Sequence, residues 1–472
     1  MSSMTAHVGV VGAGIAGLAA AWHLVRSEPD LHVTILEGSS RVGGKLRVED
    51  VGGLTLDVGA EAFLTFRPEG LQLMDEIGLA DQVAHPARVP ASVVIDGTRR
   101  PMPRGTLMGV PSDPETVRGL LTETELERLR AEVLTPPVEG DIAVGTFIDA
   151  RLGSAVTDKL VEPLLAGVYA GDSRNLSLGM AVPQLAKAAR EGTSVLALSR
   201  SLVPADRSGK DSDRPPVFAT VIGGLGTLPA FLADRLVGLG VEVRTGAVVR
   251  GLERRGGRLV VSSGPTTDVH QDVFDAVVLA TPAAPTARLL QELAPDAASR
   301  LARIESASMA IVTLVLDGPP PDVLDGSGFL VPPTERLTIK ASTFSTVKWP
   351  WLAAAHPDRT VLRASLGRHR EEATLHRSDD ELVEVSLADL TTVLGRSLPT
   401  PLAVHVQRWG GGLPQYAVGH RELVSGLVEP AADVALAGAA LSGVGIPACI
   451  ASGRRAAEVI LTRVQEGAAG LG

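Results

Sequence analysis

The stretch that decides the fold is VGVVGAGIAGLAAAWHLV, residues 8–25. Its first four residues predict a short buried strand, and its last eight predict an apolar helix. Between them Gly12, Gly14 and Gly17 have the spacing G-x-G-x-x-G. In this pattern the glycines permit a tight turn, a close approach of backbone to pyrophosphate, and close helix–sheet packing, while the first helical amides bind phosphate. The stretch therefore predicts a dinucleotide site, with these residues as cofactor contacts: Gly12, Ala13, Gly14, Ile15, Ala16 and Gly17.

A second predicted strand, HVTILE, ends in Glu37, which lies 20 residues after Gly17. A carboxylate at this spacing can accept hydrogen bonds from a ribose hydroxyl group. The next residues, GSSRVGGKL, form a basic and glycine-rich turn. This segment adds further predicted cofactor contacts: Gly38, Arg41, Gly44 and Lys45.

That basic turn resembles the R-x-G-G-[KR] motif that lies along the FAD pyrophosphate in the superfamily of amine oxidases and protoporphyrinogen oxidases. NAD-dependent dehydrogenases normally have no such turn, so the resemblance favours FAD. Residues 163–172, PLLAGVYAGD, resemble the porphyrinogen-oxidase signature P-x-x-x-G-[VI]-[YF]-A-G-[DN]. The chain is identified as a member of the protoporphyrinogen/coproporphyrinogen III oxidase family, similar to its actinobacterial members. The resemblance covers nearly the whole chain and is most specific at residues 8–45, 163–183, 221–229 and 437–455.

The resemblance implies further site residues. A turn near the flavin ring is formed by Gly59, Ala60, Glu61 and Ala62. Val248 corresponds to a backbone contact on the adenine side of FAD. The start of the C-terminal helix, Val444, Gly445 and Ile446, faces the N1–C2=O edge of the flavin, where helix amides stabilise negative charge. Arg88 corresponds to an arginine that meets a substrate propionate, with Arg99, Arg100, Lys340 and Lys348 as alternatives.

The expected fold class is α/β, with a Rossmann-like FAD-binding domain assembled from three chain segments. A mostly helical domain and a mixed α+β substrate domain accompany it. A basic hairpin with an Asp96-Gly97 turn is expected within the helical part. The expected boundaries are residues 1–80, 217–299 and 426–472 for the FAD-binding domain, 81–216 for the helical domain and 300–425 for the substrate-binding domain. Within residues 81–216, the polar, proline-rich stretch 204–216 is expected to form a mobile loop.

Composition limits the partners. The 472 residues carry a formal net charge of −10, which argues against a general nucleic-acid surface. The single cysteine, Cys449, excludes an intramolecular disulfide and any multi-cysteine metal site, and no metal is expected. No signal peptide and no membrane span are visible, so a cytoplasmic protein with at most peripheral membrane contact is expected.

The implied reaction is the six-electron oxidation of a porphyrinogen by dioxygen in three flavin cycles, each releasing hydrogen peroxide. In each cycle a hydride leaves a methylene bridge for flavin N5, while a pyrrole N–H loses its proton. No general base identifies itself in the sequence. Coproporphyrinogen III is the expected substrate and protoporphyrinogen IX the alternative. Transient contact with neighbouring haem-pathway enzymes is a further expectation.

Three other functions are weaker. A flavin amine oxidase needs an aromatic cage, and this chain has only two tyrosines and four tryptophans. A carotenoid desaturase needs a long apolar tunnel and a membrane-binding surface, whereas the arginines that follow residue 88 suit carboxylates. A non-enzymatic binding module would not need a complete flavin site.

Overall fold

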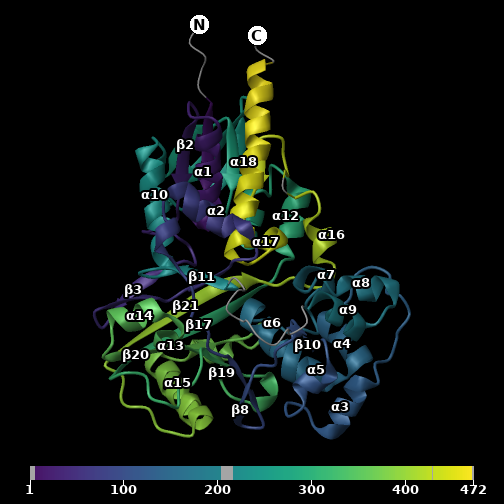
Figure 1. Ribbon diagram of the computed structural model, residues 1–472. Helices are drawn as coiled ribbons and strands as arrows, with labels where there is room; N and C mark the ends of the chain where they lie inside the picture. The colour runs from purple at the N-terminus through teal and green to yellow at the C-terminus, as the bar shows by residue number, and fades with distance from the viewer. Residues whose placement is uncertain (1–5, 204–215, 428, 470–472) are drawn as a thin grey trace.

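The computed structural model describes residues 6–203, 216–427 and 429–469. The expected mobile loop at 204–216 lies, apart from Pro216, outside these residues. Figure 1 shows both termini at the top of an upper part, above a lower part with a large sheet on one side and helices on the other.

The upper part is built on a five-stranded parallel sheet with the order β12-β2-β1-β16-β22. One row of paired residues crosses the whole sheet, running Val243–Ile35–Val10–Val278–Ala435. The strands come from separate parts of the chain: β1 (His7–Val11), β2 (His32–Leu36), β12 (Glu242–Arg244), β16 (Ala276–Leu279) and β22 (Val434–Leu436).

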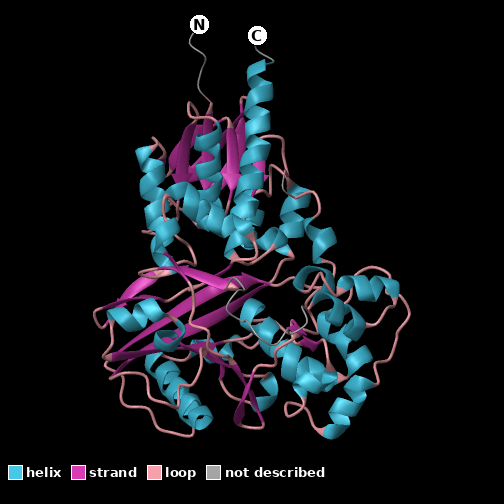
Figure 2. Cartoon of the chain, in the orientation of Figure 1, coloured by secondary structure: helices cyan, strands magenta, loops and turns pink. Residues whose placement is uncertain are grey.

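Side-chain alternation gives this sheet two cores. Val8, Val10 and Ile35 face helices that include α1, α10 and α18, whereas Val277 and Leu279 face a second layer of strands and helices. The middle layer is therefore buried on both sides, as a parallel sheet requires. The elements of the two outer layers are α1 (Ile15–Ser27), α2 (Pro68–Ile77), α10 (Leu228–Gly238) and α18 (Ile446–Ala469) on one side, and β13 (Val249–Arg255), β14 (Arg258–Ser263), β15 (His270–Phe274), α11 (Ala283–Leu289) and α12 (Pro295–Ala302) on the other. Figure 2 shows the strands of the upper part among helices.

The first and last helices of this part cross in very close contact. A Cβ atom built at Gly453 of α18 would lie 2.2 Å from the Ala16 carbonyl oxygen of α1. Only glycine fits at this crossing, because any side chain would overlap the α1 backbone. The C-terminal helix is thus packed directly on the helix that follows the glycine-rich turn.

The lower part contains a seven-stranded sheet with the order β21-β17-β20-β19-β18-β7-β8. One face packs on α15 (Asp379–Leu394) through residues such as Leu314 and Leu362. The opposite face carries Ile311 and Ser365, which pair directly and are half-buried. The strands are β7 (Ser92–Ile95), β8 (Thr98–Pro101), β17 (Ser306–Asp317), β18 (Gly328–Leu330), β19 (Ile339–Phe344), β20 (Arg359–Leu366) and β21 (Ala403–Pro414).

The predicted Asp96-Gly97 hairpin is confirmed, but its expected place within the helical part is wrong, because it pairs with the seven-stranded sheet instead. Strands β7 and β8 pair antiparallel, and the turn residues Asp96 and Gly97 have φ values of 51° and 70°. Two positive φ values are typical of a tight hairpin turn. Strand β7 also pairs parallel to β18, so the hairpin forms the outer edge of the seven-stranded sheet.

The remaining helices pack around a separate apolar cluster that includes Phe147 and Leu165. Thr122 and Glu125 form a reciprocal capping box at the start of α3. The helices are α3 (Glu123–Arg130), α4 (Val144–Leu152), α5 (Ser154–Val156), α6 (Glu162–Tyr169), α7 (Leu178–Ala181), α8 (Ala186–Glu191) and α9 (Val195–Leu202). Shorter elements connect these parts: β3 (Val48–Val51), β4 (Leu54–Asp57), β5 (Phe63–Leu64), β6 (Val83–Ala84), β9 (Thr106–Leu107), β10 (Val110–Pro111), β11 (Phe218–Val221), α13 (Ser345–Lys348), α14 (Pro350–Ala355), α16 (His420–Val424) and α17 (Ala439–Ser442).

Within the part of the chain that the structure describes, no helix combines the length and the apolar character needed to cross a bilayer.

Candidate functional site

The glycine-rich turn is closed on its inner side and open on its outer side. Gly12 has a φ of 104°, and its amide donates to the Leu36 carbonyl at 2.8 Å. A Cβ atom at Gly17 would lie 1.9 Å from the Gly12 carbonyl oxygen, so this position tolerates only glycine. At Gly14, in contrast, a Cβ atom would find no protein atom within 4 Å. The start of α1 therefore faces open space, as a phosphate site requires.

The second glycine-rich turn lies against the first. The Gly43 amide donates to the Ala13 carbonyl at 2.8 Å, and a Cβ atom at Gly44 would lie 3.4 Å from the Gly14 Cα. The Arg41 guanidinium donates to the carbonyls of Val42, Gly44 and Leu46, at 3.0, 3.0 and 3.3 Å. Arg41 thus holds the shape of its own turn. Desolvation lowers the pKa of the neighbouring Lys45.

Glu37 connects these two turns. Its carboxylate accepts hydrogen bonds from the Ala13 amide at 2.7 Å and the Ser39 amide at 2.9 Å. Its carbonyl accepts from the Ala247 amide at 2.8 Å, and a Cβ atom at Gly38 would lie 3.6 Å from the Val248 side chain. The residues predicted for the adenosine end of a dinucleotide, Glu37 and Val248, are therefore close together.

We expect Glu37→Ala to weaken FAD binding by about 1–3 kcal/mol, because hydrogen-bond partners lose their acceptor. Fluorescence titration of the apoprotein with FAD measures this. Glu37→Gln, which keeps one acceptor oxygen, should lose less affinity. Unchanged FAD affinity in Glu37→Ala would assign this carboxylate to the two backbone turns alone.

The turn at residues 59–62 is held by a buried ion cluster. The Glu61 carboxylate contacts the Lys348 ammonium at 2.5 Å and the Arg363 guanidinium at 2.5 Å. Arg363 also donates to the Gly59 carbonyl at 2.5 Å. The side chains of Glu61 and Arg363 are only 13% and 9% exposed. The cluster therefore ties a turn near the N-terminus to α13 and β20 of the seven-stranded sheet.

This cluster fixes the charge state of Glu61. Burial by itself would raise the pKa of the carboxyl group, but the charges of Lys348 and Arg363 outweigh burial and lower the pKa to about 2. Nearby Asp57 accepts hydrogen bonds from the Leu225 and Gly226 amides, yet burial dominates and raises its pKa to about 6. Glu61 is thus ionised at neutral pH and a poor proton acceptor.

The C-terminal helix α18 begins at Ile446, as predicted. In front of it, a Cβ atom at Gly443 would lie 2.3 Å from the Ala448 Cβ, so the loop folds back on its own helix. The Tyr416 hydroxyl donates to the Ala439 carbonyl at 2.5 Å, which anchors the approach to this loop. Cys449 is buried behind the loop, and burial raises its pKa to about 11.

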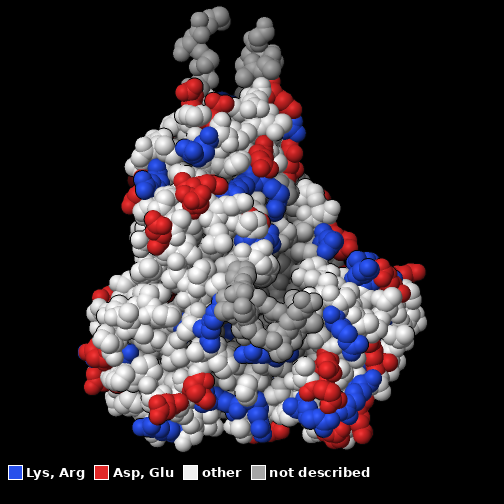
Figure 3. Space-filling view, in the orientation of Figure 1, with Lys and Arg blue, Asp and Glu red and all other residues white. Residues whose placement is uncertain are grey.

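The cationic side chains predicted to bind the carboxylates of the substrate differ in their exposure to solvent. Arg88 is exposed, and the preceding Ala87 amide donates to the Lys348 carbonyl at 2.8 Å. Lys348 lies 4.9 Å from the Trp349 ring centre. Lys340 is only 3% exposed; its ammonium donates to the Gly367 carbonyl, and burial lowers its pKa to about 7. Arg88 and Lys348 therefore lie on contacting segments, and Figure 3 shows Lys and Arg side chains around a hollow on the visible face.

Two features of the site escaped the sequence analysis. Arg363 was not singled out, although it interrupts the apolar strand RTVLRASL. A charged residue in a buried strand needs a partner of opposite charge. The position of Arg363 within an apolar strand therefore indicates a buried ion pair. The pairing of Glu61 with Lys348 and Arg363 joins residues about 300 positions apart, and no local pattern predicts it.

The open start of α1, the second turn and Glu37 together leave room for the diphosphate of a dinucleotide beside Gly14. Comparisons with known proteins identify the family. A family model described as "Flavin containing amine oxidoreductase" matches residues 15–461.

Three similar proteins cover nearly the whole chain. A protein named coproporphyrinogen III oxidase, from Mycobacterium leprae, is 36% identical over 469 residues, which span 96% of this chain and 98% of the relative. A protein of the same name from Bacillus subtilis is 31% identical over 478 residues, spanning 98% and 99%. A crystal structure described as a candidate protoporphyrinogen oxidase from Exiguobacterium sp. 255-15 has a TM-score of 0.83 and 31% identity, covering 98% of this chain and 100% of that one.

Proposed function

The chain belongs to the flavin-containing amine oxidoreductase family, and from that premise we propose that it oxidises coproporphyrinogen III to coproporphyrin III in haem biosynthesis. The enzyme is an FAD-dependent oxidase. The proposed substrate rests on one observation. Relatives named coproporphyrinogen III oxidase are 31–36% identical to this chain over nearly its whole length.

The upper part is the proposed FAD-binding domain, assembled from three separated segments that each supply strands or helices to the five-stranded sheet. The start of α1 and the turn at Gly43 and Gly44 would hold the diphosphate. Glu37 and Val248 would hold the adenosine end. Residues 59–62 and 444–446 would contact the ring. The chemistry that FAD supplies when bound is two-electron oxidation, three rounds of which convert a porphyrinogen into a porphyrin.

The chain's own contribution to this reaction is orientation of the substrate. The face of the seven-stranded sheet that carries the half-buried Ile311 and Ser365 also carries Arg363, the partner of Glu61, so it adjoins the turn at residues 59–62. Helix α6 packs beside this sheet, because a Cβ atom at Gly167 would lie 3.6 Å from Leu330. A large apolar macrocycle placed between these elements is fixed in rotation only by its carboxylates, and arginine suits them because its planar fork donates two parallel hydrogen bonds.

Proton removal from the pyrrole nitrogen is not assigned to Glu61. Its pKa of about 2 and its two cationic partners leave it without basic character at neutral pH. Asp57 has a higher pKa, but its carboxylate oxygens already accept hydrogen bonds from the backbone amides of Leu225 and Gly226. The proposed role of both carboxylates is to position the ring-side turn.

The decisive experiment compares kcat/KM of the FAD-loaded enzyme on coproporphyrinogen III and on protoporphyrinogen IX. Coproporphyrinogen III, which carries four propionates, is expected to be preferred. Hydrogen peroxide should be released at three equivalents per porphyrin, with dioxygen as acceptor. The second candidate function, protoporphyrinogen IX oxidation, rests on the similarity to the Exiguobacterium structure. A higher kcat/KM on protoporphyrinogen IX would select it.

We expect Arg88→Ala to raise KM roughly tenfold or more and to lower kcat, because a charge-assisted contact to a propionate is lost and the macrocycle tilts. Arg88→Lys should restore the charge and only part of the activity. FAD content and melting temperature should stay near wild type. Wild-type kinetics in Arg88→Ala would move the propionate contact to Lys348 or Arg99.

We also propose transient contact with the next haem-pathway enzyme, to which the reactive porphyrin product would pass. Cross-linking of the two purified enzymes during turnover would test it.

A further inference from the structure

A cavity lies away from the cofactor contacts described above. It has a volume of about 340 Å³ and is formed where four segments meet: residues 174–176, 303–305, 369–370 and 415–423. A volume of this size falls in the range of small-ligand pockets. None of the residues predicted to bind FAD lines it, nor does Arg88.

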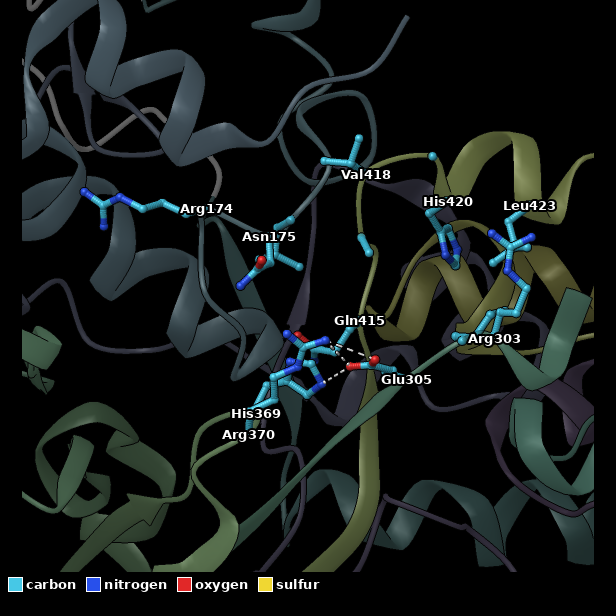
Figure 4. Close-up of a pocket in the computed structure, with 14 residues that line it drawn as sticks. Arg174, Asn175, Arg303, Glu305, His369, Arg370, Gln415, Val418, His420 and Leu423 are labelled. Atoms are coloured by element: carbon cyan, nitrogen blue, oxygen red, sulfur yellow. Dashed lines mark hydrogen bonds and ion pairs between the residues drawn. The ribbon is translucent and has the colours of Figure 1, made fainter.

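Part of the wall is apolar. Leu176 and Ile304 are almost fully buried behind the cavity, whereas Val418 leaves 49% of its surface exposed. Leu423 closes one end (Figure 4). A lining of this kind favours a ligand with an apolar body.

The charged groups of the wall are unequally compensated. Arg174 pairs with Asp149 at 2.8 Å and Asp158 at 2.7 Å, outside the cavity. Glu305 pairs with His369 at 2.8 Å and with Arg370 at 3.1 Å, and hydrogen bonds from Arg370 lower the Glu305 pKa.

Arg303 differs from the other two arginines. Its guanidinium makes no ion pair or hydrogen bond with any residue in the described ranges, and Figure 4 shows it beside Leu423 and His420. The cavity therefore carries one uncompensated positive charge next to an apolar wall.

We propose that this cavity binds a small amphipathic carboxylate, whose charged group meets Arg303 and whose apolar body covers Val418 and Leu423. The site is coupled to the C-terminal loop, because the 415–420 segment forms one wall. From that segment Tyr416 donates to the Ala439 carbonyl, and the buried His420 ring lies 3.3 Å from the Leu441 carbonyl oxygen. A ligand that fixes this wall also biases the loop in front of α18. By linkage, bound ligand and FAD then change each other's affinity by the same factor.

The test uses the FAD-loaded enzyme and a pair of probes that differ in charge. Calorimetry should show 1-naphthaleneacetate binding at one site per chain, at least tenfold more tightly than neutral 1-naphthaleneethanol. Arg303→Ala should lower the affinity for the acid to that for the alcohol. Arg303→Lys should restore part of the difference in affinity. Val418→Asp should weaken both probes.

Matched controls come from the same chain. Arg396 is also exposed and Val404 is 46% exposed, and neither lines the cavity. Arg396→Ala and Val404→Asp should bind the probes as wild type does. Equal affinity of acid and alcohol, or wild-type binding by Arg303→Ala, would overturn the site.

The coupling is tested separately, by FAD titration of the apoprotein with and without 1-naphthaleneacetate. The apparent FAD Kd should change at least twofold in wild type and stay constant in Arg303→Ala. An unchanged Kd in wild type would overturn the coupling. Turnover of Arg303→Ala without probe should equal wild type, so failure here is distinguishable from failure of the proposed oxidase activity.

Discussion

Replacing Gly14 with valine is expected to abolish FAD binding while leaving the apoprotein folded. A Cβ atom at Gly14 meets no protein atom within 4 Å, so the valine side chain fits the fold. It does, however, project into the open space at the start of α1, where the diphosphate must approach the backbone. The loss of affinity should exceed 100-fold in a fluorescence titration of the apoprotein, with a melting temperature near wild type.

Substitutions at two other glycines distinguish a block of the cofactor site from a disturbance of the protein's own packing. Gly238 also has no atom within 4 Å of a Cβ position, but it lies at the end of α10, so Gly238→Val should bind FAD normally. At Gly17 a Cβ atom would lie 1.9 Å from the Gly12 carbonyl oxygen, so Gly17→Ala should lower the melting temperature of the apoprotein itself. Full FAD occupancy in Gly14→Val would refute the placement of the diphosphate.

Glu61→Ala is expected to cause the largest loss of stability among the site variants, about 3–5 kcal/mol. Removing the carboxylate leaves Lys348 and Arg363 as uncompensated charges in a region where Arg363 is 9% exposed. The Arg363 hydrogen bond to Gly59 should weaken too, so the turn loses its anchor. Denaturant unfolding of the apoprotein measures the change without any contribution from FAD.

A surface carboxylate that also pairs with two cations provides the control. Glu115 also pairs with two cations, Arg118 and Arg130, but it is 49% exposed, so Glu115→Ala should unfold near the wild-type midpoint. A comparable loss in both variants would contradict the argument from burial.

The stability difference between wild type and Glu61→Ala should depend on pH. The folded-state pKa of about 2 lies below the ordinary value of 4.5, so the carboxylate contributes its full stability above pH 4.5. As the pH falls from 4.5 towards 2, the group is protonated and the difference should shrink. A difference that stays constant down to pH 2 would disprove the ion pairing of Glu61.

The sequence was most informative where function depends on local spacing. The glycine-rich turn, the Asp96-Gly97 hairpin and the start of α18 at Ile446 are each specified by a few neighbouring residues, and the structure has each of them. Backbone geometry at such positions leaves few choices, because positive φ values and helix starts restrict the residue types.

Side-chain pairing over long separations was not predictable. The role of Lys348 as the partner of Glu61 depends on how α13 meets residues 59–62, which only the tertiary fold determines. The edge position of the β7–β8 hairpin depends in the same way on its pairing with β18.

The close crossing of α18 over α1 has a consequence for synthesis on the ribosome. β1 and α1 are made long before β22, which completes the parallel sheet, and α18, which packs on α1. At about 5–20 residues per second, roughly 20–90 seconds separate the emergence of α1 and α18. During that time one side of α1 has no partner, and its apolar residues are exposed to water. The nascent chain is therefore expected to need a chaperone near its N-terminus until the last helix leaves the exit tunnel, and ribosome profiling of chaperone-bound chains would reveal this interval.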